Sequence, residues 1–173
     1  MTPLDDYPLH RQLLEASFAG LDRHKDYRIL DAGSGRTSLF SLASQFPISK
    51  IQALVYPGDK RKIFGIQKDV PFSNYELVEC DIVRYSCKIS YDIVLAHLLL
   101  GEATKFGNNT FESVLKALLE IETRILVIID IYNDPDVHYG LLLKRVLEKW
   151  TIRKAISIDR YIAITLTSAS DSD

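Results

Sequence analysis

The chain alternates short aliphatic runs with amphipathic stretches along most of its length. Each aliphatic run has the length of a strand and ends in a turn, and the stretch that follows repeats its apolar residues at helical spacing. This alternation is typical of a parallel sheet whose strands are connected by helices. The sequence therefore predicts an α/β fold: a single doubly wound domain with a mostly parallel seven-stranded sheet, helices on both faces and a C-terminal antiparallel hairpin. The expected strands are 27–31, 51–56, 75–80, 91–96, 125–131, 152–158 and 161–166.

The sequence marks the helices less evenly than the strands. The expected helices are 9–24, about 38–46, 59–70, 111–121 and 136–150. Thr37 or Ser38 is the expected cap of the second helix. The third is weaker, because Gly65 interrupts it at a cost of about 1 kcal/mol relative to alanine. In the last helix Trp150 is expected to face inward. These elements divide the chain into a helical segment (1–26), the α/β domain (27–168) and a polar tail (169–173).

Composition excludes several classes of protein. With 173 residues, 47% of them hydrophobic and 25% charged, the chain resembles one globular domain and not a disordered segment. Its longest aliphatic run, 125–129, is far shorter than the roughly 18 residues of a membrane span, so we expect no membrane association. Asp5 and Asp6 stand where a signal peptide carries positive charge. Cys80 and Cys87 are too few for a disulfide framework or a zinc site. The sequence therefore predicts a cytoplasmic protein without a bound metal.

The stretch Asp31-Ala32-Gly33-Ser34-Gly35 directly follows the first expected strand and precedes a helix. Ligands of open parallel sheets bind beyond the carboxyl ends of the strands, where glycines let the backbone approach them. A dinucleotide fingerprint requires a third glycine at the position of Ser38, so the glycine pair alone is weak evidence. The acid two residues before Gly33 favours a ligand with a positive charge over a pyrophosphate.

With these residues the chain resembles the class I S-adenosylmethionine-dependent methyltransferases, whose first motif is a hydrophobic strand followed by an acid-x-glycine-x-glycine turn. The resemblance extends from Arg28 to about Leu166, because the element order and the closing hairpin also match. It implies S-adenosylmethionine as the cofactor. The turn residues implied in cofactor binding are Asp31, Ala32, Gly33, Ser34 and Gly35, with Asp31 near the ammonium group.

The resemblance also assigns residues after the next three strands. Asp81 matches the acid that accepts from the adenine amino group, and Ile82 the residue that packs on the ring. His97 falls where the cofactor and the methyl acceptor meet, and it is the candidate base. The second strand departs from the family pattern, because Tyr56 occupies the place of the acid that binds the ribose hydroxyls. Asp59, three residues later, is either a ribose ligand or a cap of the next helix.

The reaction implied is methyl transfer to an acceptor that the sequence does not identify. A small molecule is favoured slightly over RNA or protein, because no binding appendage is evident and the net charge is −2. The expected acceptor pocket has the walls Tyr7, His10, 97–109 and 132–134. His10, His24 and His138 are otherwise interpreted as surface residues.

Two other function classes stay open. Tyr56 is compatible with a catalytically inactive scaffold of the same fold, and a nucleotide-cofactor (NAD) enzyme is disfavoured by Asp31 and Ser38. The basic residues Lys60, Arg61, Lys62 and Lys68 are interpreted as a solvated helix face, with an RNA-contacting patch as the alternative.

Overall fold

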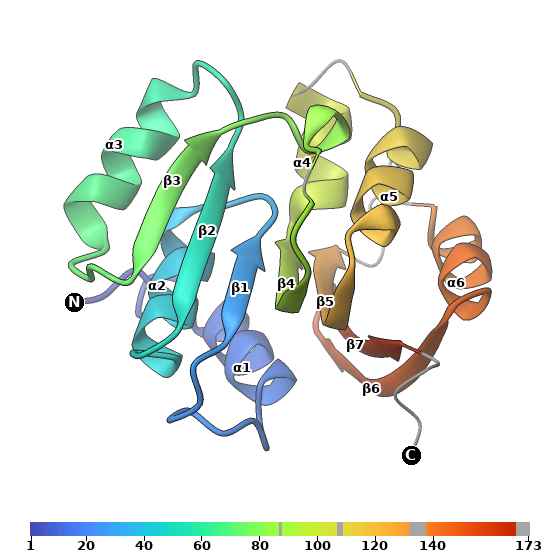
Figure 1. Cartoon of the computed structure of the whole chain (residues 1–173), viewed down its shortest axis with the longest axis horizontal. Coiled ribbons are helices and arrows are strands. Elements are labelled where there is room, and N and C mark those ends of the chain that lie inside the picture. The colour runs from blue at the N-terminus through green and yellow to red at the C-terminus, as the bar shows by residue number, and fades with distance from the viewer. Residues whose placement is uncertain (87, 107–108, 132–137, 169–173) are drawn as a thin grey trace.

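The sheet has seven strands in the order β3-β2-β1-β4-β5-β7-β6 (Figure 1). This computed structural model describes residues 1–86, 88–106, 109–131 and 138–168. β1 to β5 are mutually parallel, while β7 pairs antiparallel with both β5 and β6. The strands are β1 (Arg28–Asp31), β2 (Lys50–Val55), β3 (Tyr75–Glu79), β4 (Tyr91–His97), β5 (Thr123–Ile131), β6 (Trp150–Ile158) and β7 (Tyr161–Ser168). The predicted doubly wound fold with its closing hairpin is confirmed.

Helices cover both faces of the sheet. The α-helices are α1 (Pro8–Ser17), α2 (Arg36–Gln45), α3 (Lys60–Asp69), α4 (Leu99–Phe106), α5 (Phe111–Glu120) and α6 (Tyr139–Leu147), and Ile82–Arg84 form a 3-10 turn, η1. Helices α1, α2 and α3 cover one face of the sheet and α4, α5 and α6 the other (Figure 1). Successive residues of a strand point to opposite faces, so Ile29 belongs to the core cluster on the first face and Leu30 to that on the second. Both side chains are fully buried, as expected for a strand inside a parallel sheet.

Several element boundaries differ from the prediction. The first helix ends at Ser17 and not near residue 24, because Gly20 has a φ of +92°, which a helix cannot continue through. Gly35 and not Thr37 or Ser38 is the N-cap residue of α2, although Ser38 takes part in the cap by accepting from the Gly35 amide at 3.1 Å. Trp150 begins β6 and is not part of the last helix, whose described part ends at Leu147. The predicted start of that helix and the polar tail lie outside the described residues.

Two short elements after β3 and β4 were not predicted. The 3-10 turn η1 is capped by Asp81, which accepts a hydrogen bond from the Val83 amide. The helix α4 lies within the stretch that was expected to be a loop. The chain turns sharply before it at Leu98, whose φ of 56° is unfavourable for a branched side chain.

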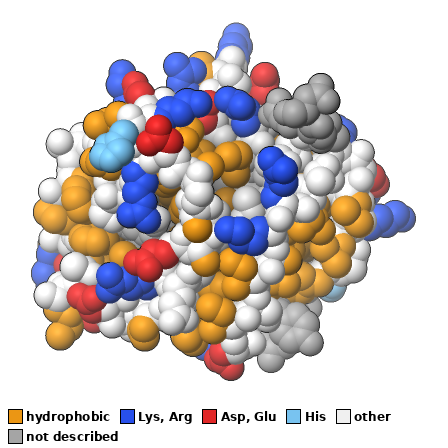
Figure 2. All heavy atoms as spheres, turned by 90° about the horizontal axis from the view of Figure 1, so that it is seen from below, with side chains coloured by type: hydrophobic (Ala, Val, Ile, Leu, Met, Phe, Trp, Pro, Cys, Tyr) orange, Lys and Arg blue, Asp and Glu red, His pale blue; other side chains and the backbone are white. Residues whose placement is uncertain are grey.

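The face at the amino ends of the strands mixes basic, acidic and hydrophobic side chains (Figure 2). Within the described ranges, no helix is long and apolar enough to cross a membrane.

The capping of α5 gives a test of these local interactions. Thr110 Oγ1 accepts from the Ser113 amide at 3.2 Å, and Ser113 Oγ accepts from the Thr110 amide at 3.1 Å. We expect Thr110→Ala to lower the free energy of unfolding by about 1 kcal/mol, measured by urea denaturation. Lys116→Ala, at an exposed position of the same helix, is the control and should change it by less than about 0.5 kcal/mol. Equal effects of the two substitutions would contradict the capping role.

Candidate functional site

The turn after β1 is fastened on both sides to the neighbouring strands. The Ala32 amide donates to the Leu95 carbonyl at 2.8 Å, and the Ser34 amide donates to the Leu54 carbonyl at 2.8 Å. Leu95 belongs to β4 and Leu54 to β2, the two neighbours of β1. The turn therefore lies at the topological switch point of the sheet, where the strand order continues to β2 and β3 on one side of β1 and to β4 and β5 on the other. Ligands of open α/β sheets bind at such a switch point.

The side chain of Asp31 stabilises the turn through hydrogen bonds. Its Oδ2 accepts hydrogen bonds from Ser34 Oγ at 2.5 Å and from Ser38 Oγ at 2.8 Å. The side chain is fully buried, and Oδ1 has no hydrogen-bond partner within the described chain. Burial raises the pKa of Asp31 to about 6, against the opposing effect of the two serine hydroxyls. Asp31 therefore supports the turn and keeps one unpaired carboxylate oxygen beneath it.

Gly33 allows α4 to approach the turn closely. A Cβ atom at this position would lie 2.7 Å from Leu99 Cδ1 and 3.1 Å from Leu99 Cβ. α4 is itself positioned by Asp130 at the end of β5, whose Oδ2 accepts from the Leu100 and Gly101 amides at 3.1 and 3.3 Å. The role of Asp130 was not predicted, because a capping residue thirty positions away from its helix leaves no local pattern in the sequence.

A cavity of about 540 Å³ opens beside the turn at the carboxyl ends of β1, β2 and β3. We call it the turn cavity. It is lined by Ala32, Gly33, Ser34, Leu54, Tyr56, Pro57, Gly58, Asp59, Lys62, Asp81, Ile82, Leu99, Glu102, Ala103 and Asn109. Its wall thus contains seven of the predicted cofactor residues, while Asp31 and Gly35 do not line it. A volume of this size is ordinary for a small-molecule site.

The polar groups of the turn cavity are partly engaged by the protein. Asp81 accepts from the Asn109 amide group at 3.0 and 3.1 Å as well as from the Val83 amide. Tyr56 is 45% exposed, in the place of the expected ribose acid. Asp59 is the N-cap of α3, and its Oδ1 accepts from the Lys62 amide at 2.9 Å. The predicted capping role of Asp59 is therefore present, and its second oxygen is not used by the cap.

A second cavity of about 700 Å³ adjoins the first. We call it the histidine cavity, because His10 and His97 both line it. Four residues line both cavities: Gly33, Asp59, Lys62 and Glu102. Lys62 Nζ and Glu102 Oε2 form an ion pair at 2.9 Å, which joins α3 to α4 at this boundary. Glu102 lies in the predicted pocket wall 97–109, and Lys62 was predicted on a solvated helix face with an RNA-contacting patch as the alternative. The pairing of the two residues was not predicted.

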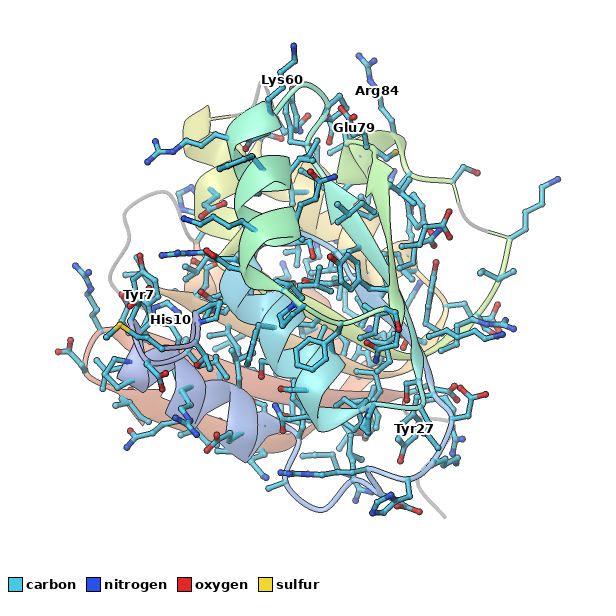
Figure 3. All side chains as sticks on the ribbon, turned by 90° about the vertical axis from the view of Figure 1, so that its left-hand side faces the viewer. Tyr7, His10, Tyr27, Lys60, Glu79 and Arg84 are labelled. Atoms are coloured by element: carbon cyan, nitrogen blue, oxygen red, sulfur yellow. The ribbon has the colours of Figure 1, made fainter. Side chains whose placement is uncertain are left out.

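The two histidines form a buried pair. His10 Nδ1 and His97 Nε2 lie 2.7 Å apart, so one of these nitrogens donates a hydrogen bond to the other. The His10 ring also contacts the edge of Tyr161 at the start of β7, with 4.6 Å between ring centroids. The prediction that His10 lies on the surface is wrong: it is 7% exposed, because the partner ring and Tyr161 cover it. Figure 3 shows His10 and Tyr7 at the beginning of α1.

Burial determines the protonation of both rings. It lowers the pKa of His97 to about 3, and the nearby His10 and Lys62 act in the same direction. Burial also lowers the pKa of His10, with Arg160 as a second cause. At neutral pH both rings are therefore uncharged. The other predicted wall of this pocket, 132–134, lies outside the described residues.

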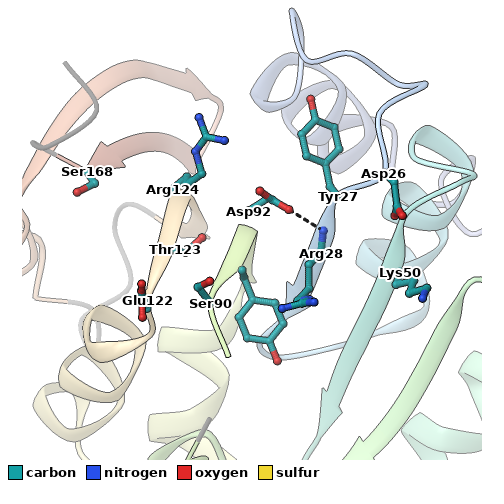
Figure 4. Close-up of a pocket in the computed structure, with 11 residues that line it drawn as sticks. Asp26, Tyr27, Arg28, Lys50, Ser90, Asp92, Glu122, Thr123, Arg124 and Ser168 are labelled. Atoms are coloured by element: carbon teal, nitrogen blue, oxygen red, sulfur yellow. Dashed lines mark hydrogen bonds between the residues drawn. The ribbon is translucent and has the colours of Figure 1, made fainter. Parts of the chain in front are cut away.

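The remaining cavities offer less chemistry. One of about 560 Å³ lies at the amino ends of the strands, where Asp92 accepts from the Arg28 amide (Figure 4). Its basic residues Arg28, Lys50 and Arg124 are matched by acidic ones, and it is remote from the glycine turn. No group of three side chains suited to a metal ion occurs among the described residues.

Comparison with known proteins identifies the fold. No model of a known protein family matches the sequence, and no curated protein sequence matches it. The N-methyltransferase NodS from Bradyrhizobium japonicum WM9, solved with S-adenosyl-L-homocysteine, has a TM-score of 0.66 at 12% identity over 97% of this chain and 89% of that chain. A TehB-like S-adenosylmethionine-dependent methyltransferase from Corynebacterium glutamicum has 0.61 at 17% identity, over 95% and 97% of the two chains. An rRNA methylase from Escherichia coli has 0.59 at 18%, over 91% and 62%. The chain therefore has the class I methyltransferase fold.

The contact between Gly33 and Leu99 can be tested by substitution. We expect Gly33→Ala to lower the free energy of unfolding by about 1–3 kcal/mol, because the new methyl group overlaps Leu99. Adding Leu99→Ala should reduce the further loss caused by the Gly33 substitution, as measured by urea denaturation in a double-mutant cycle. Gly65→Ala is the control and should not lower the unfolding free energy, because a Cβ there meets no atom within 4 Å. Strictly additive effects at 33 and 99 would contradict the contact.

The low pKa of His97 predicts a particular pH dependence of stability. Between the ordinary histidine pKa of about 6.5 and the folded value of about 3, only the unfolded chain binds the proton, so this residue lowers stability as the pH falls. Asp31 acts oppositely between about 6 and its ordinary pKa, because there the folded state binds the extra proton. When the pH falls from 7 to 5, the parent protein should therefore lose about 2 kcal/mol more unfolding free energy than His97→Gln does. The exposed His24→Gln should show no such difference, and a parallel curve for His97→Gln would disprove the low pKa.

Proposed function

We propose that this protein is an S-adenosylmethionine-dependent methyltransferase. The observation that carries the proposal is the meeting of the turn cavity with the histidine cavity at Gly33, which gives two adjoining sites at the carboxyl ends of the central strands. The solved structures with this fold support it, since they include N- and O-methyltransferases and rRNA methyltransferases, and some contain S-adenosyl-L-homocysteine. The acceptor cannot be carried over from structures at such low identity.

The turn cavity fits the cofactor in most of its parts. Ala32, Leu54 and Ile82 supply apolar surface for an adenine ring, and Asp81 has further acceptor capacity for its amino group. The turn from Gly33 to Gly35 would hold the methionine part, with the unpaired Oδ1 of Asp31 beneath it as the negative charge nearest the ammonium group. S-adenosylmethionine would supply an activated methyl group on a sulfonium, so the protein needs neither a metal nor a covalent nucleophile for the transfer.

The ribose is the part with the weakest match. A carboxylate that accepts from both hydroxyls is replaced by the phenol of Tyr56, which makes at most one neutral hydrogen bond there. Asp59 lies in the cavity wall with one oxygen committed to the cap of α3. We infer weaker cofactor binding than a carboxylate at position 56 would give, and this is why a scaffold without catalysis remains the alternative function.

The histidine cavity is the proposed acceptor site. The acceptor atom would form its bond to the methyl group as the sulfonium–methyl bond breaks, which releases S-adenosyl-L-homocysteine. His97 would take the proton of the acceptor atom once methylation has made that proton acidic, because a base with a pKa of about 3 does not remove it beforehand. His10 would hold the His97 ring through the hydrogen bond between them. The protein's main contribution is then alignment of the acceptor behind the methyl group and exclusion of water. The sequence favours a small-molecule acceptor and a cytoplasmic location.

A calorimetric titration with S-adenosyl-L-homocysteine tests this proposal. Binding of S-adenosyl-L-homocysteine without binding of NAD is expected, and the reverse would favour the nucleotide-cofactor class. Binding at about 100 times the dissociation constant should add about 2.7 kcal/mol to the unfolding free energy, which a thermal scan detects. Methyl transfer that His97→Gln abolishes while S-adenosyl-L-homocysteine still binds would separate the enzyme from the scaffold.

The two candidate ribose residues give a sharper test. Tyr56→Asp should bind S-adenosyl-L-homocysteine about 10-fold more tightly, because a charge-assisted pair of hydrogen bonds replaces one neutral bond. Asp59→Ala should lower the unfolding free energy by about 1 kcal/mol, as loss of a helix cap does, and leave affinity unchanged. A weaker Tyr56→Asp would identify the tyrosine as an adapted contact, and a large loss of affinity in Asp59→Ala would identify Asp59 as the ribose acid.

A further inference from the structure

One face of α3 forms a wall of the histidine cavity. Arg61, Phe64, Gly65 and Lys68 all line it, and their spacing places them on the same side of the helix. This face was interpreted from the sequence as solvated, but it borders the proposed acceptor site. The charges and the shape of this face therefore influence which methyl acceptor can bind in the cavity.

Two positive charges of this face, Arg61 and Lys68, have no partner among the described residues. Neither Arg61 nor Lys68 makes an ion pair or a side-chain hydrogen bond within the described chain, and both are exposed. The other basic residues of the cavity are committed: Arg36 pairs with Asp69 at 2.9 Å and with Asp6, and Lys62 pairs with Glu102. The same pairs occupy the acidic residues Asp69 and Glu102, and the third acidic residue of the lining, Asp59, caps α3. Arg61 and Lys68 therefore leave an unneutralised positive charge on this wall.

Gly65 leaves a recess between these two charges. Glycine inside a helix costs about 1 kcal/mol relative to alanine, and nothing in the packing requires it here, because a Cβ would meet no atom within 4 Å. Beside the recess, Phe64 is 67% exposed, which is unusual for a large aromatic side chain. The face therefore combines two free cations, an open gap and an exposed aromatic ring.

We propose that this face of α3 binds a nucleotide, so that the methyl acceptor is a nucleotide or a base within single-stranded RNA. Phosphate oxygens would be contacted by Arg61 and Lys68, while a base would stack on Phe64. A cavity of about 700 Å³ is large enough for a mononucleotide. This inference rests on the proposed function, because it assigns the acceptor of the same site.

The experiment measures binding of a fluorescent single-stranded RNA decamer and its displacement by AMP, in the presence of S-adenosyl-L-homocysteine. The parent protein should bind the RNA with an affinity that falls with salt concentration. Arg61→Ala combined with Lys68→Ala should weaken binding at least 10-fold and reduce the salt dependence, and Phe64→Ala should weaken it about 10-fold. Gly65→Ala should raise thermal stability yet weaken binding, a combination that a purely structural role would not give.

Lys60→Ala is the matched control. Lys60 is exposed at the start of the same helix, does not line the cavity, and projects away from Tyr7 and His10 in Figure 3. It should bind RNA as the parent does. Affinity for S-adenosyl-L-homocysteine, measured on every variant, should stay unchanged, because Arg61, Phe64 and Lys68 do not line the turn cavity.

The outcomes separate this inference from the proposed function. Tighter binding of the decamer than of AMP supports a strand as acceptor, and displacement by AMP at similar affinity supports a free nucleotide. Binding of S-adenosyl-L-homocysteine with binding of neither nucleotide ligand would overturn the inference alone. Equal losses in Lys60→Ala and in the double variant would overturn it as well, since they would indicate attraction by net charge. Failure to bind S-adenosyl-L-homocysteine would overturn the proposed function instead.

Discussion

The pairing of β1 with β2 on one side and with β4 on the other is the constraint on which the site depends. These parallel ladders place the ends of three strands at one edge of the sheet, and the same hydrogen-bond pattern continues into the turn through Ala32 and Ser34. The turn cannot move without breaking a ladder. Both cavities therefore have a rigid floor, and their walls come from the more variable loops and helices that follow each strand.

Asp31 and His97 are buried titratable groups at this edge of the sheet, and burial affects them in opposite ways. Asp31 is driven toward its neutral acid form, and His97 toward its neutral base form. Hydrogen bonds compensate only part of the loss of hydration in each case. Asp31 accepts from two serine hydroxyls, and His97 shares a hydrogen bond with one other imidazole. A chain selected for stability alone would place apolar residues at such positions, because an uncompensated buried polar group is costly. Their presence together, on either side of Gly33, is an independent reason to regard this edge as functional.

Features that are contiguous in the sequence could be predicted, whereas contacts between distant residues could not. The strand around 125–129 is a continuous aliphatic run, and the glycine turn is a contiguous motif, so the sheet and the turn were predicted within a few residues. The histidine pair joins residues 87 positions apart, and no periodicity within α1 distinguishes His10 from a surface histidine. α4 was overlooked because its capping group, Asp130, comes from β5. For the same reason the role of Lys62 at the boundary of the cavities became evident only from its partner Glu102 on another helix.

The antiparallel direction of β7 has a consequence for how such a protein can change. Because β7 runs against its neighbours, its first residue, Tyr161, lies at the carboxyl edge beside Ile131 of β5, and the hairpin turn at Asp159 and Arg160 reaches the same edge. At this edge β1, β2 and β4 each lead into a helix, α2, α3 and α4. Lengthening one of these connections would displace a helix that packs on the sheet. The hairpin turn leads only from one strand to the next. Residues inserted there would extend the wall near His10 without altering any parallel ladder, which makes this turn the least costly place for a new acceptor specificity to arise.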